Sequence, residues 1–277
     1  MSIAFVNNVK TVLLLGALMG LVVGVAASFG GAEAIVPALI IAILMNFGAF
    51  FFSDKIAISA MRGQQVTGGK LYDMVDELRQ RAGLPMPKVY VCPQQAPNAF
   101  ATGRSPKHAA VAVTEGALQL LSREELEGVM AHELAHVKNR DTLTSTIAAT
   151  VGGLMAMLAY GMMMFGGHGR QGGNPLVLLL TVIVGAVGAA VIKGMISRSR
   201  EFVADADGAR IAGSPDGLIN ALRKLEMYAK RIPMQNPNPA QNNLFIIEPL
   251  TGGKTLSNLF ATHPPTERRV EALMTLR

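Results

Sequence analysis

The sequence predicts a mainly α-helical integral membrane protein with four transmembrane helices and a cytoplasmic α+β domain that contains a small β-sheet. Of its 277 residues, 50% are hydrophobic and only 16% are charged, which is too apolar for an ordinary soluble protein. Four uncharged stretches are long enough to cross a hydrocarbon core of roughly 30 Å. They run from Thr11 to Gly31, from Ala34 to Ser53, from Thr142 to Gly169 and from Gln171 to Ile192.

The distribution of Lys and Arg predicts the orientation of these spans. If all four cross the membrane, 11 of the 25 basic residues lie in segment 53–140 and 12 in segment 193–277, while only Arg170 lies in an opposite connection. Because cytoplasmic loops carry the excess of positive charge, both polar segments and both termini should be cytoplasmic. A cleaved secretory signal ending near Ala32 is the alternative for the N-terminus, but the apolar run is long for a signal and a second one follows at once.

The charge pattern and the single cysteine argue against a nucleic-acid-binding protein and against a disulfide-stabilised protein. The basic residues are interspersed with acidic ones and show no aromatic stacking pattern, so we expect no nucleic-acid partner and attribute the charge to anionic lipid headgroups. A lone Cys92 excludes an internal disulfide and suits a reducing compartment.

Secondary structure in the polar segments follows from apolar periodicity and from breakers. Residues 70–82 read as an amphipathic helix that ends near Gly83, and further helices are expected from Pro215 and from Pro264 onward. The last helix should point Val270, Leu273 and Leu276 inward. Segments 88–92 and 109–114 read as short β-strands, with a strand or turn at 97–103 between them.

Residues 132–136 read His-Glu-Leu-Ala-His and carry the most specific chemical signal in the chain. A capping box at Ser122 predicts a helix here, which places His132 and His136 one turn apart on one face. Two imidazoles in this arrangement can bind one zinc ion while Glu133 handles a proton. The polar segments are therefore predicted to form a zincin-like catalytic domain.

A catalytic zinc needs a third protein ligand, and Glu201 is the best candidate. It follows the fourth apolar stretch, and the hairpin formed by the third and fourth stretches should return it to the side of the motif helix. Asp205 lies one turn further along the same predicted helix, where it could hydrogen-bond a ligand imidazole and fix its tautomer. The predicted organisation is a membrane hairpin at 1–53, a catalytic part at 54–141, a second hairpin at 142–192 and a second catalytic part at 193–277.

Together, the motif at 132–136, the Glu-Phe-Val-Ala-Asp run at 201–205, the stretch at 98–103 and two spans on either side of the motif resemble the HtpX family of bacterial membrane heat-shock proteases. This family is related to the CAAX prenyl proteases. The resemblance implies a zinc endopeptidase of the bacterial inner membrane, with a cytoplasmic active site, that acts on misfolded membrane proteins in stress response and quality control. It implies one Zn²⁺ per chain held by His132, His136 and Glu201, with Glu133 as the catalytic base.

Two further residues are candidates with strong structural alternatives. A developing oxyanion needs an electrophile besides zinc, and His263, held before Pro264, is the candidate, although a helix-capping role fits it equally well. Asn98 could bond the backbone of a substrate added as a strand, or simply form a turn. We expect polypeptide substrates and the lipid bilayer as partners, and the sequence predicts no oligomeric state.

Three other functions compete with this interpretation. An intramembrane protease would bury its zinc within a span, but charged residues flank the motif on both sides. A prenyl-peptide protease would need a larger membrane chamber than four spans provide. A membrane scaffold or holdase with a structural or vestigial zinc site would have no need of the base Glu133.

Overall fold

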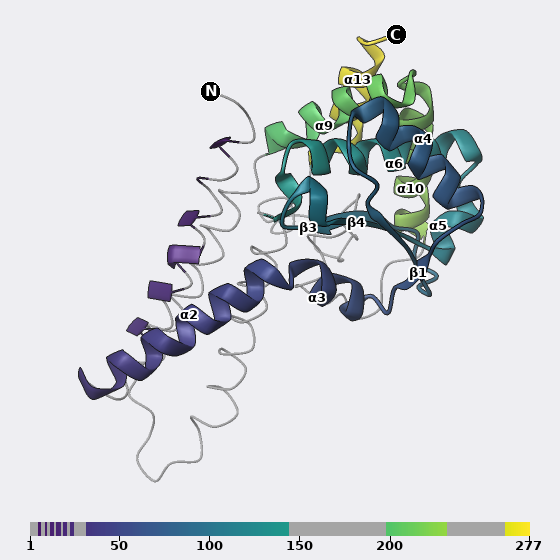
Figure 1. Cartoon of the computed structure of the whole chain (residues 1–277). Coiled ribbons are helices and arrows are strands. Elements are labelled where there is room, and N and C mark those ends of the chain that lie inside the picture. The colour runs from purple at the N-terminus through teal and green to yellow at the C-terminus, as the bar shows by residue number, and fades with distance from the viewer. Residues whose placement is uncertain are drawn as a thin grey trace.

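The computed structural model describes residues 32–143, 198–231 and 264–277, together with scattered positions between 5 and 24. One domain and one protruding helix make up this part of the chain (Figure 1). The described elements are η1 (Ala32–Ala34), α2 (Ile35–Phe51), α3 (Ser53–Ala60), β1 (Gln64–Val66), α4 (Lys70–Ala82), β2 (Lys88–Cys92), β3 (Ala99–Gly103), η2 (Pro106–His108), β4 (Ala109–Thr114), α5 (Glu115–Leu120), α6 (Arg123–Lys138), α9 (Arg198–Ala212), α10 (Asp216–Arg231) and α13 (Thr266–Met274).

The sheet has four strands in the order β1-β2-β4-β3. The two inner strands, β2 and β4, run parallel with Val89 opposite Val111, and an antiparallel strand closes each edge. Both inner strands have the bounds that the sequence predicts, and the predicted strand or turn at 97–103 contains β3. All six residues of β4 are buried, as expected for a parallel inner strand covered on both faces.

Each face of the sheet packs against a different set of helices. Val111 and Val113 of β4 join the larger core, to which α4, α6, α9, α10 and α13 contribute. The alternate residues Ala110 and Ala112 pack against α3 on the other face. This follows from the two-residue period of a strand, and Figure 1 shows the helices on either side.

The predicted helices of the domain are confirmed, with one correction. Helix α4 buries its apolar stripe and ends at Gly83, whose φ of 69° closes the helix in the left-handed region that glycine tolerates. Helix α13 buries Val270 and Leu273 as predicted, but Leu276 is 44% exposed. The prediction for Leu276 was wrong because α13 ends at Met274, so the helical period no longer directs this side chain inward.

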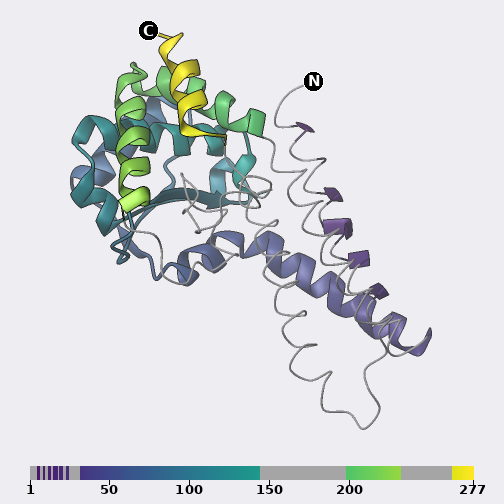
Figure 2. The ribbon, with the colours of Figure 1, turned by 180° about the vertical axis from the view of Figure 1, so that it is seen from behind.

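Helix α2 lies within the second predicted span and extends away from the domain (Figures 1 and 2). Its large apolar side chains, Leu44 and Phe47 among them, are exposed. Within the described residues, none of the helices combines the length and the apolar character needed to cross a membrane. The first and third predicted spans lie largely outside the described residues and the fourth lies wholly outside them. The four-span arrangement stays a prediction.

Candidate metal centre

Helix α6 holds the His-Glu-Leu-Ala-His motif, and its start is fixed by side chains. The Ser122 hydroxyl accepts a hydrogen bond from the Glu125 backbone N–H at 3.2 Å, and the Glu125 carboxylate accepts one from the Ser122 backbone N–H at 2.7 Å. This is the predicted capping box. Burial raises the pKa of Glu125, but Lys224 and the capping bonds outweigh it and leave the pKa lowered.

Helix α9 crosses α6 at the motif because a glycine allows a close approach. A Cβ at Gly208 would lie 2.9 Å from the Cα and backbone N of His132. Glu201 and Asp205, at spacings of seven and three residues before Gly208, lie on the same side of α9 and reach the motif. The expected return of the chain beside the motif helix is thus confirmed.

Three side chains converge between the two helices. The Nε2 atoms of His132 and His136 lie 3.1 Å apart. The Glu201 carboxylate places Oε1 3.6 Å from the His136 Nε2 and Oε2 3.7 Å from the His132 Nε2. Ligand atoms of all three lie within 4.8 Å of one another.

The donor set fits zinc. Two imidazole nitrogens bound to one tetrahedral zinc at about 2.0–2.1 Å are separated by roughly 3.3 Å, close to the separation found here. Two imidazoles and one carboxylate form a typical catalytic set, which leaves a fourth position for water. His132, His136 and Glu201 could therefore hold the ion with small movements of their side chains.

In each imidazole, a carboxylate lies next to Nδ1, the nitrogen that points away from the shared metal position. Asp205 Oδ1 lies 3.0 Å from Nδ1 of His132, and Asp141 Oδ2 lies 3.1 Å from Nδ1 of His136. Since an ionised carboxylate only accepts hydrogen bonds, each carboxylate favours a proton on Nδ1, and a ring with one proton then has a lone pair on Nε2. This is the tautomer that a zinc ligand requires. Asp205 therefore lies beside a proposed ligand imidazole, and its role in fixing the tautomer stays a prediction.

Acidic groups dominate the electrostatics around the histidines. Burial alone would lower the pKa of His136, but the carboxylates of Glu201 and Asp141 outweigh it and raise the pKa to about 9. The same negative field that favours an imidazolium favours a divalent cation beside the ring. Two buried arginines, Arg269 and Arg200, offset part of the acidic charge at Asp205 and Asp141.

Glu133 is only 5% exposed and lies between α6 and the edge strand β3. Burial is the main cause that raises the pKa of Glu133, and Glu201 adds to it, while the two histidines and the backbone N–H of Ala101 act in the opposite direction. A carboxylate with a raised pKa is a better proton acceptor, as general-base catalysis near neutral pH requires.

The other predicted site residues have different outcomes. Asn98 is buried at the start of β3, where its backbone N–H donates to Thr114 Oγ1 at 2.8 Å, so its backbone helps to fix the edge strand. His263 lies outside the described residues. The sequence analysis missed Asp141, Arg200 and Arg269, although Asp141 follows His136 by only five residues.

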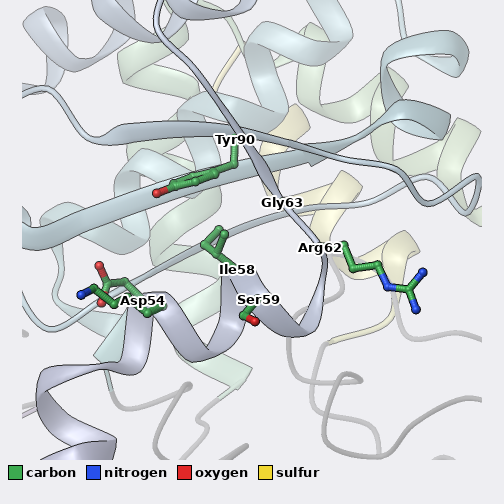
Figure 3. A pocket seen from close by; sticks show the side chains of 7 residues that line it. Asp54, Ile58, Ser59, Arg62, Gly63 and Tyr90 are labelled. Carbon is green, nitrogen blue, oxygen red and sulfur yellow. The ribbon is translucent and has the colours of Figure 1, made fainter.

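A separate cavity of about 450 Å³ lies between α3 and the sheet, and none of the candidate ligands lines it. In Figure 3 the ring of Tyr90 lies above Ile58 with its hydroxyl on the side of Asp54, while the Arg62 guanidinium points away. Burial and the Asp54 carboxylate raise the pKa of Tyr90, so this phenol stays neutral. The lining carries charges of both signs and indicates no particular ligand.

The comparison with protein families decides the assignment. The model of peptidase family M48 matches residues 66–277. The chain belongs to peptidase family M48. This confirms the predicted resemblance and makes the protein a membrane-associated zinc metallopeptidase.

Curated relatives agree over nearly the whole chain. A protein named Protease HtpX homolog from Syntrophotalea carbinolica is 50% identical over 273 residues, covering 96% of this chain and 98% of the relative. A second one, from Desulfatibacillum aliphaticivorans, is 50% identical over 277 residues, covering 96% of this chain and 89% of the relative. The M48 peptidase resembles both over nearly its whole length.

A solved structure shares the fold. The crystal structure of Ste24p from S. mikatae matches with a TM-score of 0.53 at 16% identity, covering 98% of this chain. This chain spans 66% of the length of Ste24p. At this identity the match shows only that the M48 peptidase shares this fold.

Proposed function

We propose that this M48 peptidase is an endopeptidase that cleaves misfolded or damaged membrane proteins at the cytoplasmic face of a bacterial inner membrane. One observation carries the proposal: a convergent His-His-Glu group lies beside a buried carboxylate, Glu133, next to an edge strand. In the proposed enzyme, His132, His136 and Glu201 are the zinc ligands and Glu133 is the general base. A structural zinc site has no need of a general base.

The edge strand β3 is suited to hold an extended polypeptide. The backbone N–H of Thr114 donates to the Asn98 carbonyl, so Asn98 faces β4 and, by the alternation of an antiparallel ladder, Ala99 and Ala101 direct their backbone groups away from it. A substrate paired to this edge would lie parallel or antiparallel to β3, beside Glu133. Asn98 could then contribute its side-chain amide at one end of the strand.

Proton transfer in the proposed reaction belongs to Glu133. Bound zinc would polarise a water molecule and the substrate carbonyl. Glu133 accepts the proton of this water as the water oxygen attacks the carbonyl carbon, and then delivers it to the leaving amine nitrogen. Asp205 is placed to hold the imidazole of His132 in the tautomer that presents Nε2 to the ion. His263 remains the candidate for a second contact to the oxyanion.

The proposed membrane arrangement keeps the four segments predicted from the sequence: hairpins at 1–53 and 142–192, and catalytic parts at 54–141 and 193–277. A small-residue stripe supports the first hairpin, since Ala38 and Ala42 are buried on α2 and Asn46, one turn further, donates from Nδ2 to the Leu15 carbonyl at 2.9 Å. The one-sided placement of Lys and Arg supports the cytoplasmic catalytic parts.

Glu133→Gln tests the proposed base. The detergent-solubilised full chain, its Glu133→Gln variant and the control Glu124→Gln are given an unfolded soluble protein or a destabilised membrane protein as substrate, and bound zinc is quantified in each. We expect Glu133→Gln to lower the cleavage rate by roughly 10²–10⁴-fold while zinc stays bound, because only proton transfer is removed. Glu124 is exposed on the same helix and its variant should cleave like the wild type.

Two results would contradict the proposal. A wild-type chain that binds little zinc and cleaves neither substrate would favour the alternative function, a membrane scaffold or holdase. Cleavage of the soluble substrate alone would keep the peptidase but remove the proposed preference for membrane proteins.

A further inference from the structure

Each of the two proposed histidine ligands begins a series of side-chain contacts from His to Asp to Arg. In the first, His132 Nδ1 faces Asp205, which Arg269 binds through two nitrogens at 2.7 and 2.9 Å. In the second, His136 Nδ1 faces Asp141 Oδ2, and the other oxygen of Asp141 lies 3.4 Å from an Arg200 guanidinium nitrogen. The sequence predicted a role for Asp205 in the first series but none for Asp141 or Arg200 in the second.

Asp141 is held in an unusual piece of backbone at the end of α6. The helix ends at Lys138, and Arg140 follows with a φ of 58°, a left-handed conformation that a non-glycine residue rarely adopts. Asp141 is only 3% exposed. The strained turn brings its carboxylate back toward the helix it has just left, where it meets the imidazole of His136.

Asp141 also stands at the base of a long insertion. Residues 144–197 separate it from Arg200, yet the two side chains make contact and both are buried. The next residue, Thr142, donates from its hydroxyl to the Gly103 carbonyl at 3.0 Å, at the end of the edge strand β3. The residues just before the insertion therefore contact a proposed zinc ligand, the edge strand β3 and the chain that follows the insertion.

We propose that Asp141 is a positioning residue for His136, and that its pair with Arg200 joins the chain before residue 144 to the chain after residue 197 beside the metal centre. The inference rests on the proposed role of His136 as a ligand. It links the two described segments that flank residues 144–197 to the orientation of one imidazole. Arg200 directly precedes Glu201, so the pair also sets the position from which the third ligand is presented.

Zinc affinity is the readout that separates this role from a purely structural one. The full chain in detergent is stripped of metal and titrated with zinc in competition with a chromophoric chelator. Asp141→Ala and Asp141→Asn should bind zinc roughly 10–100-fold more weakly, the range expected when a partner of a ligand imidazole is lost. Arg200→Gln should show a smaller loss, and Arg200→Gln combined with Asp141→Ala should bind no more weakly than Asp141→Ala alone, because both act through one chain of contacts.

Asp207→Asn is the matched control. Asp207 also joins α9 to the end of α6, through a 3.1 Å hydrogen bond from Asn139, but it touches no proposed ligand. Its variant should bind zinc like the wild type. Cobalt in place of zinc gives a second readout, since the visible absorption of the bound ion should change in Asp141→Asn and stay unchanged in Asp207→Asn.

Wild-type zinc affinity and cobalt absorption in Asp141→Asn would overturn the inference. Thermal unfolding of the metal-free variants separates a folding defect from a binding defect. If Asp141→Ala does not fold, the zinc affinity of the isosteric Asp141→Asn variant decides the test. A wild-type chain that binds no zinc would instead overturn the proposed metal centre itself.

Discussion

Arg269 contacts two carboxylates of the metal centre. It is 1% exposed, it binds both oxygens of Asp205, and one of its nitrogens lies 3.7 Å from a Glu201 oxygen. Burial alone would lower the pKa of Arg269, but Asp205 and Glu201 raise it, so the guanidinium stays charged. In return, this cation outweighs the effect of burial on Asp205 and lowers the pKa of that carboxyl. Neither ion of this pair would be stable at this depth without the other.

Replacing Arg269 should therefore lower the free energy of unfolding more than replacing its neighbour Arg268. Arg269→Gln leaves the Asp205 carboxylate buried with an incomplete set of partners, and we expect a loss of about 3–5 kcal/mol in the free energy of unfolding. Arg268→Gln changes an exposed residue on the same helix and should stay within about 0.5 kcal/mol of the wild type. Thermal or denaturant unfolding of the metal-free chain measures both, and equal stability of the two variants would contradict the argument.

At the scale of elements, glycines set how closely the helices around α6 can approach. Gly208 of α9 rests on the backbone of His132, whereas Gly128 of α6 and Gly217 of α10 rest on each other's helices. The first crossing brings Glu201 and Asp205 to the histidines. The second contributes packing but brings no proposed ligand.

Gly208→Ala should weaken zinc binding, and Gly128→Ala should not do so to the same extent. A methyl at Gly208 meets the His132 backbone at 2.9 Å, so α9 has to move away and takes Glu201 with it. We expect zinc affinity to fall by at least about tenfold together with stability, since such overpacking typically costs 1–3 kcal/mol. Gly128→Ala should lower stability by a similar amount. Zinc titration and thermal unfolding of both variants, with Gly68→Ala as a control at an open position, check this difference.

The elements that the sequence predicted are those with a strong local signal. The strands at 88–92 and 109–114 alternate or run continuously in apolar residues between breakers, and α6 has a capping box, so local chemistry decides them. Helix α3 and the three-residue strand β1 were not predicted, because Gln64 and Gln65 give no apolar alternation and α3 is stabilised by packing against the distant sheet.

The same division holds within the metal centre. His132, Glu133 and His136 follow from their spacing on one helix, and Asp205 follows from its spacing to Glu201. Arg269 was missed because its role comes from a contact between distant segments. Asp141 was missed because only the left-handed turn at Arg140 returns its carboxylate to His136. An Arg-Arg pair at 268–269 gives no sign of which residue is buried, and only the position of α13 against α9 decides it.

At the scale of the whole molecule, the catalytic domain and the apolar stretches are joined at few points. Helix α2 runs into α3 through Phe52, and α3 packs on the sheet face opposite the metal centre. The insertion leaves and returns on the side of the metal centre, at Asp141 and Arg200. Both faces of the sheet are therefore tied to segments proposed to lie in the membrane, which is consistent with a substrate strand entering along β3 close to the lipid surface.

This arrangement predicts which surfaces face the two sides of the membrane. Ala32 lies in the proposed outer connection and Glu267 on exposed α13, so a membrane-impermeant maleimide should label Ala32→Cys in intact cells and Glu267→Cys only after the membrane is opened. The wild-type chain is the background control, because Cys92 is buried and burial raises the pKa of its thiol to about 11, leaving little reactive thiolate. Labelling of Glu267→Cys in intact cells would place the metal centre outside the cytoplasm, and protection of Ala32→Cys would argue against the first hairpin.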